Sequence, residues 1–104
     1  SPALVYMFIE ALGDGAVLKG LPRDKAYKMA SQVVLGAAKM VLATGKHPGQ
    51  LKDSVCSPGG TSIEAVYSME KSGFRGYVIE AMQRSTEKAE LLGIEMDESH
   101  TDSQ

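Results

Sequence analysis

The sequence predicts an all-α fold of about five helices, and three observations lead to that prediction. Glycine and proline, 11 and four in number, divide the 104 residues into segments of helical length. The long segments repeat their apolar residues at helical spacing. No segment alternates apolar and polar residues as a half-buried strand does. A chain of this length corresponds to a single domain.

The helix-breaking residues define the elements in order. Four helices are expected, over residues 2–19, 23–44, 61–72 and 74–92. A short helical turn is expected to begin at Pro48, between the second and the third. Pro2 suits a first helical turn, because its missing amide hydrogen has no helical partner there in any case. Glycine suits the position just after a helix end. Four of them follow the predicted segments: Gly20, Gly45, Gly73 and Gly93.

Several polar residues have a structural explanation. Thr61 and Glu64 have capping-box spacing, with a hydroxyl at the N-cap and a carboxylate three residues later. His47 precedes Pro48 just after a helix end, where capping or packing is expected. Cys56 is expected to be small, buried packing, although a reactive thiolate near a helix N-terminus is the alternative.

The first two long helices carry more apolar surface than one stripe can hold. Between Ala30 and Ala43 the only polar side chains are Ser31, Gln32 and Lys39. A helix that is apolar nearly all round needs cover nearly all round. We therefore expect a second copy of the chain to cover it; a central helix buried in a compact monomer is the alternative. Small residues in both helices suit close contact: Gly13, Gly15, Ala16, Gly36, Ala37 and Ala38.

The last helix shows an ordinary amphipathic pattern. Its apolar and small residues share one stripe: Tyr77, Val78, Ala81, Met82, Ser85 and Ala89.

Composition excludes several classes of partner. The formal net charge is −2 and no block of Lys or Arg is present, so neither a nucleic-acid surface nor a basic membrane patch is expected. The apolar run Ala3–Ile9 is too short to cross a bilayer. The single cysteine fits a reducing compartment. No Cys and His set has metal-ligand spacing, so no metal site is expected. "GDGAVL" lacks the third glycine and the preceding strand of a dinucleotide fingerprint.

The stretch "CSPGGTSIE", residues 56–64, combines a turn with the start of a helix. Gly59 and Gly60 expose backbone amides without obstruction by side chains. The unpaired amides at the start of the next helix, together with its dipole, favour a small anion such as a carboxylate. An ordinary turn with an N-cap remains the alternative. Three hydroxyls surround the loop: Ser57, Thr61 and Ser62.

Several stretches, taken together and in this order, resemble one family. They are "MFIEAL", "GLPRD", "LGAAKM", "HPGQLKD", "CSPGGTSI" and "GFR", within residues 7–75. This pattern resembles the C-terminal domain of pyrroline-5-carboxylate reductase, over about residues 2–92. "HPGQLKD" followed by "SPGGT" is the specific part of the match.

The resemblance implies a protein in which a Rossmann domain, binding NADPH or NADH, precedes the helical domain. It implies that the helical domains interlock into a homodimer, which can assemble further. The implied reaction reduces 1-pyrroline-5-carboxylate to proline in the cytoplasm. Residues 1–93 would form the dimerisation and substrate-binding domain, and residues 94–104 a polar, disordered tail. Because Ser1 lies within a stretch that the family shares, further residues are expected before it, and this chain alone is expected to be inactive.

The resemblance also implies a substrate-binding loop that faces the cofactor of the partner subunit. Ser57 and the amides of Gly60 and Thr61 would receive the substrate carboxylate. Ser62, the implied catalytic residue, would lie near the ring nitrogen; many relatives carry threonine there. The implied substrate-binding residues are Val55, Cys56, Ser57, Gly59, Gly60, Thr61 and Ser62.

Two alternative functions remain open at this level. The chain could be a helical self-association module that binds no ligand. It could also be the helical domain of another Rossmann-type dehydrogenase that acts on a different small carboxylate.

Overall fold

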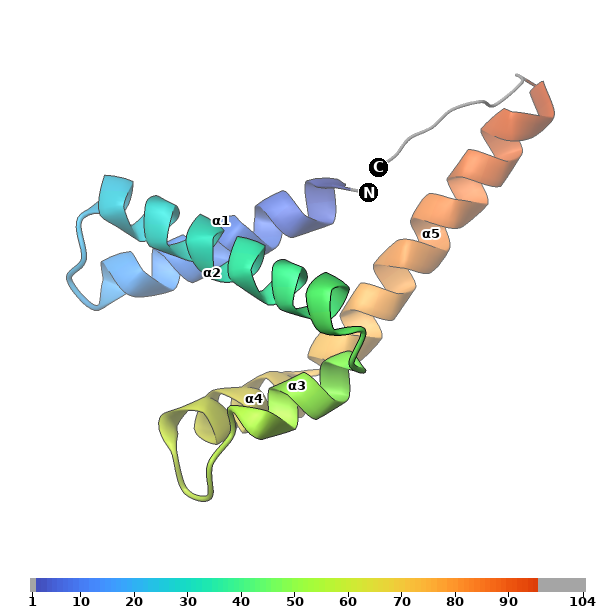
Figure 1. Ribbon diagram of the computed structural model, residues 1–104. Coiled ribbons are helices and arrows are strands. Elements are labelled where there is room, and N and C mark those ends of the chain that lie inside the picture. The colour runs from blue at the N-terminus through green and yellow to red at the C-terminus, as the bar shows by residue number, and fades with distance from the viewer. Residues whose placement is uncertain (1, 96–104) are drawn as a thin grey trace. The chain divides into compact units, whose positions relative to one another are not determined.

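The computed structural model describes residues 2–95, and side chains over residues 2–92. Five helices and no strand occupy the described range: α1 Pro2–Leu18, α2 Arg23–Thr44, α3 Pro48–Ser54, α4 Thr61–Ser72 and α5 Phe74–Glu95 (Figure 1). The predicted all-α fold of about five helices is confirmed. The chain divides into two compact units, Pro2–Leu51 and the part from Lys52 onward, and each is described by itself.

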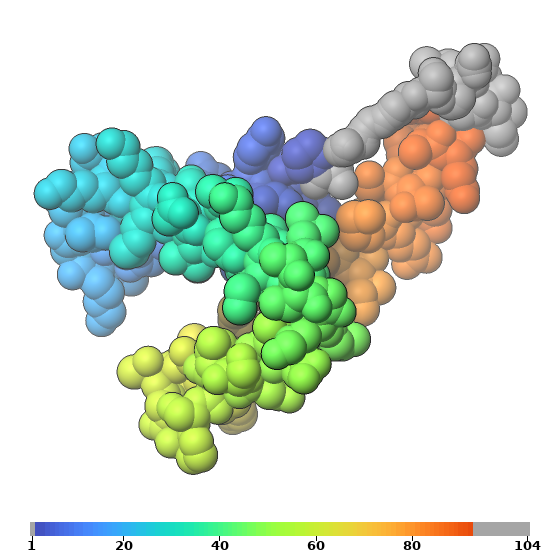
Figure 2. Space-filling model, in the orientation of Figure 1, coloured from blue at the N-terminus to red at the C-terminus, as the bar shows by residue number. Residues whose placement is uncertain are grey.

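The first unit is a hairpin of α1 and α2. The two helices run in opposite directions and pack against each other (Figure 1), and their atoms lie against one another in the space-filling view (Figure 2). Gly20, at φ +106°, makes the turn that ends α1. Its amide donates to Val17 O at 2.9 Å, and the Leu21 amide donates to Ala16 O at 3.1 Å. Only glycine adopts a positive φ without steric cost, which explains why glycine occupies position 20 at the end of α1.

Small residues bring the two helices of this hairpin close together. Ala26 and Ala30 are the buried apolar residues of α2, at 0% and 3% exposure, and Gly13 is the buried residue of α1. A Cβ atom added to Gly13 would overlap the ring of Tyr27. For Gly13, the expectation of close helix contact is therefore confirmed. Gly15 and Gly36 differ, because a Cβ added to either would meet no atom of the described residues within 4 Å.

An arginine holds the Tyr27 ring against Gly13. Arg23 Nη1 donates to Asp14 Oδ1 at 2.7 Å and to Tyr27 Oη at 2.8 Å. Its guanidinium lies 5.5 Å from the centroid of the same ring. The hydrogen bond to Asp14, more than that to Tyr27, raises the pKa of Arg23 above its usual value. The three side chains thus link the end of α1 to the start of α2.

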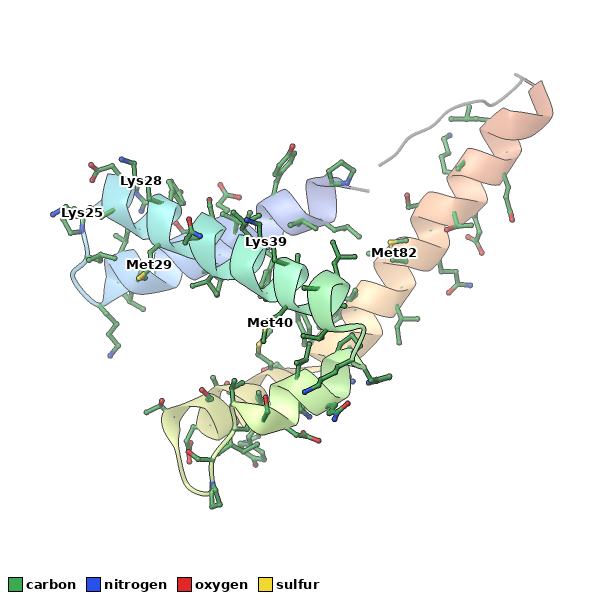
Figure 3. The ribbon with its side chains drawn as sticks, in the orientation of Figure 1. Lys25, Lys28, Met29, Lys39, Met40 and Met82 are labelled. Carbon is green, nitrogen blue, oxygen red and sulfur yellow. The ribbon has the colours of Figure 1, made fainter. Side chains whose placement is uncertain are left out.

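The apolar surface of α2 remains largely uncovered. No large side chain among the described residues is fully buried. Met29, Val33 and Met40 are 50%, 59% and 53% exposed, and with Gly36 they recur at helical spacing on one face. We call these four residues the α2 stripe. In Figure 3 the labelled methionines of the stripe project from one side of α2, and Lys28 and Lys39 from another. Within its own unit, α2 is therefore not a buried central helix.

A histidine caps α3, which is one of the two roles predicted for it. His47 Nδ1 accepts a hydrogen bond from the Gly49 amide at 2.9 Å. The His47 carbonyl accepts from the amides of Gln50 and Leu51, at 2.9 and 3.1 Å. The imidazole therefore caps this short helix through Nδ1.

The second unit contains α4 and α5, which meet at a glycine. Gly73, at φ +89°, ends α4, and its amide donates to Glu70 O at 3.1 Å. The side chain of Glu70 then accepts from Arg75 Nε in α5 at 2.8 Å. The break between the two helices is thus set by glycine and bridged by an ion pair.

Helix α5 differs from its prediction in length and in cover. It continues through Gly93 to Glu95, so the predicted end at Gly93 is wrong. A glycine inside a helix costs about 1 kcal/mol relative to alanine, which neighbouring good helix formers can offset. Of its predicted apolar stripe only Ala81 is half-buried, while Val78 and Met82 remain exposed. The predicted tail lies outside the described residues from residue 96 onward.

No helix in residues 2–95 has both the length and the apolar character to cross a membrane.

Candidate functional site

A tight turn forms the loop between α3 and α4. The Gly60 amide donates to Ser57 O at 3.0 Å, which closes a four-residue turn around Pro58 and Gly59. Gly59 has φ +70°, and proline followed by glycine at positive φ is typical of a type II turn. The sequence Ser-Pro-Gly-Gly is therefore explained in part by turn geometry alone.

The start of α4 differs from the predicted capping box. Gly60 is the N-cap, at φ −82° and ψ 177°, and no side chain caps the helix. Thr61 is thus the first helical residue. The Glu64 amide donates to Gly60 O at 3.3 Å, as the first hydrogen bond of the helix. The capping-box prediction is wrong because the helix begins one residue earlier than the box requires, with Gly60 and not Thr61 as the N-cap. Thr61 then stands inside the helix, where its hydroxyl cannot act as an N-cap.

The amides of the first helical turn are consequently open. Those of Thr61, Ser62 and Ile63 have no hydrogen-bond partner among the described residues. Three adjacent N–H groups at the positive end of a helix dipole favour an anion. The Gly60 amide, in contrast, is engaged in the turn. The implied use of that amide for a carboxylate therefore differs from what this structure presents.

Hydroxyl groups lie around these amides. Ser57, Thr61 and Ser62 are exposed, and Gly60 and Cys56 are half-buried. Cys56 is therefore not the fully buried packing that we expected. Val55, before the turn, is 66% exposed. The seven predicted substrate-binding residues thus form one solvent-facing segment ahead of and at the start of α4.

The glycine-containing segment of the first helix has a clear outcome. "GDGAVL" lies inside α1, so its glycines do not form the strand-to-helix turn of a nucleotide site. Among the described residues, no group of three His, Cys, Asp or Glu side chains could hold a metal ion.

A hollow elsewhere in the second unit was not predicted. It has a volume of about 240 Å³ and is lined by Lys52, Val66, Met69, Glu70, Phe74 and Arg75. Because Met69 lies eight residues beyond Thr61, the hollow is about 12 Å along α4 from the loop. The motif "GFR" was the available signal, since it supplies Phe74 and Arg75.

The fold and the exposed helix faces define the class of this protein: an all-α association domain. Its small hairpin core leaves the α2 stripe exposed. Residues 1–92 match the family described as "Pyrroline-5-carboxylate reductase dimerisation". The chain belongs to that family, and the family's dimerisation supports homo-oligomerisation.

Individual relatives agree with this assignment. The chain is 65% identical over 92 residues to the pyrroline-5-carboxylate reductase of Escherichia coli, covering 88% of this chain and 34% of that protein. It is 55% identical over 91 residues to the pyrroline-5-carboxylate reductase of Pisum sativum, with 88% and 33% covered. The chain therefore spans about a third of the length of these curated relatives.

A solved structure shares the fold. The crystal structure of Plasmodium falciparum pyrroline carboxylate reductase with NADP bound superposes with a TM-score of 0.82 at 38% identity. The match covers 88% of this chain and 35% of that one.

Proposed function

We propose that this chain is the dimerisation and substrate-binding domain of a reductase that converts 1-pyrroline-5-carboxylate to proline with NAD(P)H. The observation that carries the proposal is the open helix start after the Ser57–Gly60 turn, in a chain of this family. Such a group of amides suits a substrate with a small carboxylate.

The carboxylate of the substrate binds at the start of α4. The free amides of Thr61 and Ser62 donate to it, and Ser57 adds its hydroxyl. A helix N-terminus binds an anion through N–H groups and its dipole, so no arginine is required. Holding the carboxylate fixes one end of the ring and thereby orients its C=N bond.

Ser62 acts at the other end of the substrate. Reduction adds hydride to the imine carbon and a proton to the ring nitrogen, which becomes the amine of proline. The Ser62 hydroxyl donates a hydrogen bond to the nitrogen or relays that proton. The nicotinamide cofactor supplies the hydride.

The cofactor is held outside this chain. The only glycine pair with the beginning of a dinucleotide fingerprint lies within α1, where its amides belong to the helix. An additional Rossmann domain, placed before this sequence, would bind NADPH or NADH.

The protein functions as a homodimer in this proposal. The two helical domains interlock as a homodimer, and higher homo-oligomers are possible assemblies of that dimer. The α2 stripe is the surface that we assign to this contact, because contiguous exposed apolar residues mark interaction sites. In the dimer, the loop of one subunit faces the cofactor of the other. We place the protein in the cytoplasm, with no nucleic-acid or membrane partner and no metal.

Substitution of Ser62 tests the catalytic role. In the full-length protein, Ser62→Ala is expected to lower kcat by about 100-fold, since proton transfer by a placed side chain contributes that order of magnitude. Ser62→Thr keeps the hydroxyl and should retain most activity. Ser68→Ala, an exposed serine in the same helix, is the matched control. The assay follows NAD(P)H absorbance with 1-pyrroline-5-carboxylate as substrate.

The outcomes separate the candidate functions. Equal activity of Ser62→Ala and Ser68→Ala contradicts the role of Ser62. A wild-type protein that reduces another small carboxylate, but not this one, indicates a different dehydrogenase. A protein that reduces neither and binds no proline analogue is a ligand-free association module.

A further inference from the structure

The two adjacent glycines of the loop are glycines for different reasons. Gly59 has φ +70°, which only glycine adopts easily, so the turn itself requires it. Gly60 has φ −82° and ψ 177°, an extended conformation that any residue adopts. The backbone therefore gives no reason for a glycine at position 60.

The space around Gly60 supplies the reason. A Cβ atom added there would lie 2.6 Å from Ser57 Oγ and 3.3 Å from Ser57 O. The turn causes this proximity, because the Gly60 amide donates to that same carbonyl at 3.0 Å. The place of a side chain at residue 60 is thus already occupied by the Ser57 hydroxyl.

The hydroxyl is the part of this contact that can move. Ser57 Oγ is the end of a side chain with one rotatable bond and three staggered positions. The carbonyl is fixed by the turn, but at 3.3 Å a shift of a few tenths of an ångström relieves its contact. An alanine at residue 60 should therefore rotate the Ser57 hydroxyl away and leave the turn closed.

The position that the hydroxyl would leave is the start of α4. Gly60 directly precedes the three amides, Thr61 to Ile63, that have no partner among the described residues. Within those residues the Ser57 hydroxyl is likewise not used for a hydrogen bond. It is thus available to a ligand that the amides bind.

We propose that Gly60 is a positioning residue: its missing side chain keeps the Ser57 hydroxyl at the helix start, where it donates to the substrate carboxylate. This inference rests on the proposed function. It assigns to Gly60 an effect on binding that is exerted through Ser57 and not through its own amide.

A double-mutant cycle in the full-length protein tests this coupling. Gly60→Ala and Ser57→Ala should each raise KM for 1-pyrroline-5-carboxylate about tenfold, as expected for one lost hydrogen bond to a charged group. The kcat values should change far less than KM. The double variant should have the KM of Ser57→Ala alone, because the hydroxyl that Gly60 accommodates is already absent. Gly76→Ala, which adds a methyl group in open space, is the matched control.

Each possible result supports the proposal, overturns it or rejects the proposed function on which it rests. A double variant whose KM is the product of the two single effects overturns the proposal, since Gly60 then acts independently of Ser57. Loss of folding in Gly60→Ala, measured by thermal unfolding, also overturns it, because the carbonyl contact then dominates. A wild-type protein without activity on this substrate rejects the proposed function instead. A crystal structure of Gly60→Ala with Ser57 in a new rotamer and the turn intact supports the proposal directly.

Discussion

The contact between Gly13 and Tyr27 yields the sharpest prediction about stability. Gly13→Ala adds a methyl group that would overlap two carbons of the Tyr27 ring, because it would lie closer to them than van der Waals contact allows. Overpacking of this kind costs about 1–3 kcal/mol. The ring can rotate away only by losing its hydrogen bond from Arg23 and its cation–π contact with the same guanidinium. Either response destabilises the hairpin.

Gly15→Ala is the control that isolates this overlap. Both glycines lie in α1, and both alanines gain about 1 kcal/mol of helix propensity. Because a Cβ on Gly15 meets no atom within 4 Å, only that gain remains. The propensity term cancels between the variants, so their unfolding free energies should differ by about 1–3 kcal/mol.

The assay is chemical denaturation of the full-length protein at a fixed protein concentration, because association contributes to the apparent stability. Equal stability of the two variants would refute the close approach of α1 and α2 at Gly13. Lower stability of Gly15→Ala would show instead that another chain packs there.

Two further predictions concern other positions. Gly36→Leu in the α2 stripe should weaken the dimer about tenfold or more in sedimentation experiments, because its open space would be filled by the second copy. Ser31→Leu, on the opposite side of α2, should leave the dissociation constant of the dimer unchanged. An unchanged dissociation constant for Gly36→Leu as well would contradict the role of the α2 stripe in dimerisation. His47→Ala should lower the free energy of unfolding by about 1 kcal/mol through loss of the α3 cap, whereas His47→Asn should retain it. Equal thermal unfolding of the two His47 variants would count against the cap.

The loop shows where sequence reasoning reached its limit. The turn and a following helix were predictable, because proline and glycine have narrow conformational roles. The N-cap was not, since Thr61 fits the capping pattern as well as Gly60 does. Only the closed turn, in which the Gly60 amide is already used, decides that the helix begins at Thr61 and which amides are open.

The sequence by itself determined the helices, the residues that end them and the excess of apolar surface on the first two. Glycine and proline impose local limits on φ, and helical spacing places residues on faces without knowledge of other elements. The tertiary structure alone decided which small residues are needed. Gly13 contacts Tyr27, whereas a Cβ added to Gly15 or Gly36 would meet no atom within 4 Å in residues 2–95. That difference depends on which helix faces approach each other, and residues distant in sequence set such approaches.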